Sequence, residues 1–123
     1  MKSALNWFEI PVVNLDRATH FYEKVLEAKL KRENFGGTEM AIIVAEDPGV
    51  GGALVLDAKR KPQGDGTLVY LNANSRLDAA IRLVSESGGS ILVPKTDMGQ
   101  IGAFALIRDT EGNQVGLHSE AAK

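Results

Sequence analysis

The sequence predicts a small α+β domain made of two consecutive β-α-β-β-β modules. Three observations indicate this class: apolar residues recur at helical spacing in two segments, strand-like segments flank each of them in the same order, and a polar linker separates the halves. The chain has 123 residues, which suits one domain. We therefore expect a single domain over residues 1–123, with a first module at about 4–57 and a second at about 67–119.

The first module begins with a strand and a helix. In residues 5–13 side chains alternate between two faces, so Trp7 and Glu9 share the face opposite to the main apolar side chains. Asn14 is a residue type that caps helices, and the apolar residues at 15–26 follow helical spacing. Short strands are expected next, at residues 28–35, 39–45 and 52–57.

The second module follows a polar linker at residues 58–66, AKRKPQGDG, whose basic run KRK is expected to be solvated. A strand is predicted at 67–73, with Tyr70 facing the helix, and a helix at 75–87, ended by two glycines. Segment 94–102 contains glycines and precedes a strand, and it is expected to be a flap over a ligand or, as the alternative, an ordinary connection. The remaining strands are predicted at residues 90–93, 102–108 and 114–119.

The two modules match at their helix starts, where LDRA at 15–18 corresponds to LDAA at 77–80. A chance match is the alternative, because this pattern opens many helices. Duplication predicts two mixed, curved half-sheets, each covered by a helix on its outer face. The uncovered faces would then enclose a common cavity.

Composition excludes several function classes. Lys and Arg number 14 and Asp and Glu 16, so a net charge of -2 gives no reason to expect nucleic acid or an anionic membrane as a partner. The chain has no cysteine, which excludes disulfides, thiolate metal sites and a cysteine nucleophile. No apolar run is long enough to span a membrane, and the N-terminus lacks a signal-peptide pattern. We therefore expect a cytoplasmic protein.

Two segments carry a family resemblance: the opening, WFEIPVVNLDRATHFYEKVLEAKL, and the ending, DTEGNQVGLHS. Together they resemble the vicinal oxygen chelate superfamily of glyoxalases, bleomycin resistance proteins and extradiol dioxygenases, whose closing hairpin is written D-P-x-G-N-x-x-E-L. The resemblance covers nearly the whole chain and is greatest to a glyoxalase-related branch of unassigned function. It implies paired βαβββ modules around a cavity, commonly with a divalent metal, and a homodimer.

The resemblance also implies where metal ligands should lie. The family places His or Glu at positions on the first and last strands of each module, and in this chain these fall on Trp7, near Leu54, on Val69 and on Gly116. None of the four side chains suits a metal of that family. We therefore expect no metal and no cofactor; a divalent metal held in a rearranged way is the alternative.

Two titratable residues neighbour these positions. Glu9 lies two residues after Trp7, and His118 two after Gly116, so each shares a face with its neighbour. Glu9 is the candidate base and His118 a second candidate catalytic residue, because a carboxylate in an apolar cavity can titrate near neutral pH. The alternative is that both are solvated or bonded to each other. The expected ligand-binding set is Trp7, Glu9, Val69, Leu71, Ile101, Gly102, Gly116 and His118.

These observations favour a binding protein for a small apolar or aromatic molecule, without the usual metal. Trp7 would stack on the ligand or fill the space of the missing metal. Two other functions stay open. The first is a lyase or isomerase using Glu9 as base, with or without a non-standard metal. The second is a structural or interaction domain.

Overall fold

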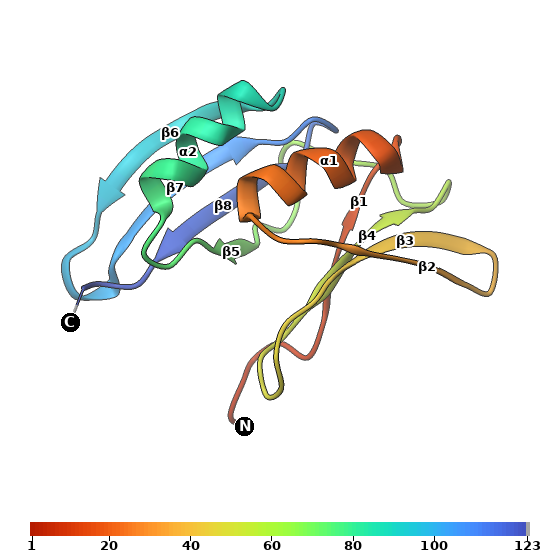
Figure 1. The fold of residues 1–123 in the computed structure, drawn as a ribbon, viewed down its shortest axis with the longest axis horizontal. Coiled ribbons are helices and arrows are strands. Elements are labelled where there is room, and N and C mark those ends of the chain that lie inside the picture. The colour runs from red at the N-terminus through yellow and green to blue at the C-terminus, as the bar shows by residue number, and fades with distance from the viewer. Residues whose placement is uncertain (123) are drawn as a thin grey trace.

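A computed structural model describes residues 1–122 of the chain (Figure 1). Its element order confirms the predicted succession of two βαβββ modules. The first module contains β1 (Phe8–Pro11), α1 (Leu15–Leu26), β2 (Lys31–Phe35), β3 (Thr38–Ile43) and β4 (Gly52–Leu56). The second contains β5 (Tyr70–Asn72), α2 (Leu77–Glu86), β6 (Ser90–Asp97), the short 3-10 helix η1 (Gly99–Ile101), β7 (Ala103–Arg108) and β8 (Gln114–Ser119).

Each module forms its own four-stranded mixed sheet. The strand orders are β1-β4-β3-β2 and β5-β8-β7-β6. In the first sheet β1 pairs in parallel with β4, and in the second β5 pairs in parallel with β8. Figure 1 shows both helices on one side of the molecule, α2 across the second sheet and α1 across the first. We call the face of each sheet turned away from the helices its open face. Among residues 1–122, no helix is long and apolar enough to cross a membrane.

The main core lies between the helices and the two sheets, and both modules contribute to it. Phe21 and Tyr22 of α1 are fully buried and meet edge to face, with ring centroids 5.0 Å apart. Because α1 packs on α2 as well as on its own sheet, the two modules share one apolar interior. Other core residues from both modules are Ile10, Val12, Leu54, Leu71, Val84, Ile107 and Leu117.

The turn between β7 and β8, residues 109–113, is a buried polar clasp between the modules. Tyr22 donates its hydroxyl hydrogen bond to Asp109 Oδ2 over 2.6 Å. Asn113 Nδ2 donates to the Pro11 carbonyl over 2.8 Å and also to Asp109 Oδ2 over 3.0 Å. The clasp therefore connects the last hairpin of the second module to the first strand and helix of the first.

Glu111 of the same clasp holds the start of α1. Its Oε1 accepts hydrogen bonds from the backbone N–H groups of Val13 (2.9 Å) and Asn14 (2.8 Å), and its Oε2 accepts one from Arg17 Nε (2.7 Å). A carboxylate at a helix N-terminus satisfies free backbone donors and complements the helix dipole. Asn14 adds the predicted cap, since its side chain accepts from the Arg17 N–H.

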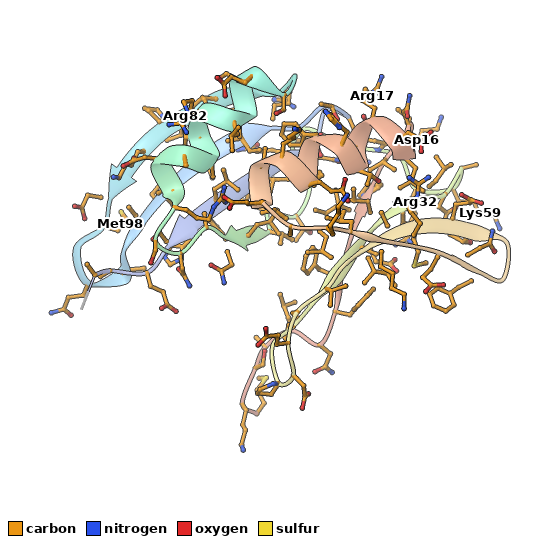
Figure 2. The ribbon with its side chains drawn as sticks, viewed as in Figure 1. Asp16, Arg17, Arg32, Lys59, Arg82 and Met98 are labelled. Carbon is orange, nitrogen blue, oxygen red and sulfur yellow. The ribbon has the colours of Figure 1, made fainter. Side chains whose placement is uncertain are left out.

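Charged side chains at the start of α1 lie on the outside of the molecule. Figure 2 shows Asp16 and Arg17 projecting from the first turn of α1, with Arg32 of β2 near Asp16. Arg32 Nη2 donates to Asp16 Oδ1 over 2.9 Å, and both side chains are largely exposed. A pair of this kind contributes little to stability.

Two expectations about the second module are wrong in detail. Tyr70 was expected to face the helix but is 51% exposed on the open face, because Leu71 is the residue of β5 that points into the core. The strand expected at 90–93 continues to Asp97, so residues 94–97 of the expected flap belong to β6. Register irregularities let this edge strand pair with β7 on both sides of Pro94, which has no N–H to donate.

Candidate functional site

The open face of the first sheet carries Glu9 in an ion-pair network. Arg60, from the linker, donates from Nη2 to Glu9 Oε1 over 2.6 Å, and Trp7 Nε1 donates to Glu9 Oε2 over 3.3 Å. Arg60 Nε also lies 3.4 Å from Asp57 Oδ2. The hydrogen bond to Glu9 is the main cause that raises the pKa of Arg60. Both carboxylate oxygens of the expected base are therefore engaged.

Arg60 is the functional-site residue that sequence reasoning missed. The run KRK was interpreted as a solvated patch, yet its middle residue crosses to β1 and pairs with Glu9. One feature of the sequence could have indicated this: Asp57 and Arg60 are three residues apart, a spacing that allows an ion pair. In the structure they form that ion pair and an isolated antiparallel β-bridge, which turn the linker back toward the sheet. The long-range partner of Arg60 leaves no local pattern.

The open face of the second sheet carries an aromatic patch, defined as Tyr70, Phe104, Leu106, Gly116 and His118. Tyr70 pairs with Gly116 across β5 and β8, and its ring lies over that glycine, so a Cβ at Gly116 would overlap the ring. Phe104 meets Tyr70 edge to face, with centroids 6.1 Å apart. The strand register places Leu106 beside Gly116 and Phe104 beside His118.

His118 lies at the edge of the aromatic patch and contacts the segment after β6. Its Nε2 is 2.7 Å from the Ile101 carbonyl, which requires that Nε2 carries the proton. Ile101 itself is 67% exposed. Gly102 follows with φ 104°, and a Cβ there would overlap the Ser119 carbonyl, so Gly102 is needed for the close approach of the chain to β8.

The structure distributes the expected ligand-binding residues over three places. Trp7 and Glu9 lie together on the first sheet. Gly116, His118, Ile101 and Gly102 lie together on and beside the second. Within residues 1–122 no hydrogen bond joins Glu9 to His118. The remaining two expected residues, Val69 and Leu71, pack against the core.

Leu54 and Leu71 do not lie on the open faces of the sheets. Leu71 is 5% exposed and Leu54 fully buried, because strand alternation turns both toward the helices. The β4 residue that faces the open side is Ala53, which pairs with Glu9 of β1. The corresponding pair in the second module is Tyr70 with Gly116.

The four residues of these two pairs, Glu9, Ala53, Tyr70 and Gly116, lie at, or close in the sequence to, the positions where the family resemblance implies the ligands of a metal. Only Glu9 carries an acidic or imidazole side chain there, and it is bound by Arg60. At the fourth position the ring of Tyr70 lies over Gly116. Across residues 1–122, no three His, Asp or Glu side chains are grouped so that they could hold a metal. The donor set does not fit the family's His and Glu site.

Comparison with known proteins relates this geometry to a family. Residues 4–117 match the model described as the Glyoxalase/Bleomycin resistance protein/Dioxygenase superfamily. None of the curated proteins matches the chain.

Solved structures share the fold at low sequence identity. A glyoxalase/bleomycin resistance protein from Albidiferax ferrireducens T118 has a TM-score of 0.75 at 16% identity, covering 97% of this chain and 100% of that one. A glyoxylase/bleomycin resistance protein/dioxygenase domain from Frankia sp. EAN1pec has 0.74 at 18%, covering 98% and 100%. TnmS3, an antibiotic binding protein from Streptomyces sp. CB03234, has 0.68 at 20%, covering 97% of each chain.

Proposed function

Because the chain belongs to the glyoxalase/bleomycin resistance protein/dioxygenase superfamily, we propose that it binds a small aromatic or apolar molecule on its aromatic patch, without the family's metal. The membership confirms the resemblance read from the opening and closing segments. The binding function is our inference, and the exposed ring of Tyr70 against the half-buried Phe104 carries it.

The physical support is that an exposed aromatic surface is held rigidly. Gly116 lets the ring of Tyr70 lie on the sheet, and Phe104 meets that ring edge to face, so little side-chain entropy remains to be lost on binding. A flat aromatic ligand can cover such a surface and remove apolar area from water. The polar edge at His118 offers one hydrogen-bonding group for orientation. A neighbour in structure, TnmS3, is described as an antibiotic binding protein.

We also propose a homodimer, because the second sheet has exposed apolar side chains on the face that no helix covers. Tyr70 is 51% exposed there and Leu92 is 39% exposed. A second copy could cover such surfaces and bring Glu9 of one chain toward the aromatic patch of the other. The cytoplasmic location remains a prediction.

The enzyme alternative gains no support from the site. Glu9 would act as a base only after losing Arg60, since the guanidinium hydrogen bond occupies Oε1. The structural or interaction alternative predicts that no small aromatic probe binds to the patch, so a binding titration distinguishes it from the proposed function.

The test is a titration of ¹⁵N-labelled protein with 1-naphthol, a neutral aromatic probe, and separately with bleomycin. Backbone amide chemical shifts report the binding. We expect saturable shifts on β5, β7 and β8 with at least one probe. Phe104→Ala should weaken binding by roughly two- to tenfold, the worth of one aromatic contact. Phe35→Ala is the matched control, because Phe35 is 58% exposed on β2 and far in sequence from the patch. Equal affinity in Phe104→Ala, or no binding of either probe, would reject the proposal.

A further inference from the structure

A concavity lies where the two modules meet, beside the edge strand β5. It is a cleft of about 670 Å³ between the N-terminal segment, the end of α1, the β3–β4 loop and β5. In Figure 1 the N-terminal segment and the β3–β4 loop lie together at the bottom of the view, away from α2. The volume is in the range of small-molecule sites, about 300–1,000 Å³.

The walls of the cleft are apolar. Phe8, Leu26, Ile43 and Val69 all line it and pack with their inner sides against the main core. They belong to the helix-facing side of the sheets, and Tyr70 also lines the cleft, so the cleft adjoins the aromatic patch at β5. An apolar ligand chain would find a preformed surface here.

One end of the cleft is polar, and its side-chain amides are oriented by the chain itself. Asn72 Oδ1 accepts a hydrogen bond from the Asn74 N–H over 2.8 Å, and Asn74 Oδ1 accepts one from the Glu120 N–H over 2.7 Å. These bonds fix which amide atom is oxygen, so both Nδ2 groups remain as donors. Within residues 1–122, neither Nδ2 has an acceptor.

Arg76 completes this polar end, and its side chain is only 22% exposed. Its Nη1 donates to the Val25 carbonyl over 2.8 Å, which secures the end of α1. Its Nε lies 3.3 Å from the exposed carboxylate of Glu27, but neither Nε nor Nη2 has a hydrogen-bonded acceptor within residues 1–122. A buried donor without an acceptor is unfavourable, so a ligand oxygen at this end would be stabilised. The other charged residue lining the cleft, Glu46, is on the β3–β4 loop.

We propose that this cleft binds a small molecule with an apolar chain and a carboxylate. The chain lies against Phe8, Leu26 and Val69, and the carboxylate accepts hydrogen bonds from Arg76, Asn72 and Asn74. Convergent amide and guanidinium donors select an anionic head, and the apolar walls select an aliphatic or aromatic body. This site shares Tyr70 with the aromatic patch, but its lining does not include Phe104 or Leu106, and it does not rest on the proposed function.

The experiment titrates ¹⁵N-labelled protein with decanoate and, as its uncharged counterpart, with decanol. Binding is monitored by the NMR signals of the Asn72 and Asn74 side-chain NH₂ groups and of the Arg76 Nε–H. We expect saturable shifts of these signals with decanoate and at least about tenfold weaker binding of decanol, because a charge-assisted hydrogen bond is lost. No saturable shift with decanoate, or equal binding of decanol, would overturn the proposal.

Variants distinguish binding of decanoate in the cleft from binding elsewhere on the protein surface. Asn72→Asp keeps the acceptor for the Asn74 N–H but replaces the donor by a carboxylate, so decanoate should bind about tenfold more weakly or not at all. Asn34→Asp is the matched control, since it adds the same charge on β2 while keeping its acceptor for the Gly37 N–H. Arg76→Gln should weaken binding similarly, and Phe104→Ala should leave it unchanged. Loss of decanoate binding in Phe104→Ala, with Asn72→Asp unaffected, would place the probe on the aromatic patch and overturn the proposal.

Discussion

At the scale of single residues, Gly116 shows how one position changes a site. The family motif has an acidic residue there, but this chain has glycine, and the ring of Tyr70 occupies the space beside it. Glycine and tyrosine form one unit, because the ring can lie flat on the sheet only where no Cβ interferes. The substitution therefore exchanges a metal donor for an aromatic surface.

Gly116→Ala tests this unit. We expect a loss of about 1–3 kcal/mol in the free energy of unfolding, because the added methyl group displaces the Tyr70 ring. Urea unfolding measures it, and the loss should disappear when Tyr70→Ala is combined with Gly116→Ala. Gly66→Ala is the control, since a Cβ there meets only ordinary contacts. Equal losses with and without the Tyr70 ring would contradict the explanation.

Glu111 gives a prediction for pH. Burial would raise its pKa, but hydrogen bonds from Arg17, Asn14 and Val13 outweigh burial and lower the pKa from its ordinary value of 4.5. A carboxyl group whose pKa is lower in the folded state stabilises the fold above its unfolded pKa, and this stability is lost as pH falls through the folded value. Wild-type protein should therefore lose stability in acid below about pH 4.5.

Glu111→Gln should reduce the free energy of unfolding at pH 7 by about 1–3 kcal/mol and flatten its decline in acid. Urea unfolding from pH 7 downward measures both effects. Glu86→Gln is the control, because Glu86 is exposed at the end of α2. An unchanged acid profile in Glu111→Gln would show that another group controls the decline.

At the scale of elements, the two helices begin differently. The Asn14 side chain caps α1, whereas Arg76, the residue before α2, makes no side-chain cap. The sequence predicted the first start correctly, because capping is a local interaction between neighbours in the chain. The length of β6 was not predictable in the same way. This strand contains Pro94 and two irregularities of register, and its second half is a strand only because β7 lies beside it.

Asn14→Ala should destabilise the protein by about 0.5–2 kcal/mol, since the Arg17 N–H loses its acceptor. Asn14→Ser keeps a capping oxygen and should remain close to wild type. Thermal unfolding of the two variants side by side measures the difference. Equal destabilisation by serine and alanine would mean that the cap is not the cause.

At the scale of the whole molecule, a common core and a polar clasp join the modules. The burial that surrounds Tyr22 raises the pKa of its phenol well above 10.0, so the hydroxyl stays protonated and donates to Asp109. Because both modules contribute to one core, we expect them to unfold together.

Calorimetry should show a single transition, with the calorimetric enthalpy equal to the van't Hoff enthalpy. Tyr22→Phe should lower the free energy of unfolding by about 1–3 kcal/mol without splitting the transition, because Asp109 loses a buried donor. Tyr70→Phe is the control, since Tyr70 is half exposed. Two separate transitions in the wild type would show that the modules are independent.

The sequence by itself determined the α+β class, the paired modules and the capped start of α1. Each of these depends on periodicity or on interactions between near neighbours, which a linear pattern records. The tertiary structure decided that Arg60 pairs with Glu9, that Tyr70 rather than a carboxylate faces the open side, and that Asn72, Asn74 and Arg76 meet an apolar cleft. Those outcomes depend on contacts between distant segments and on which face each strand turns outward, and a shift of one residue reverses that face.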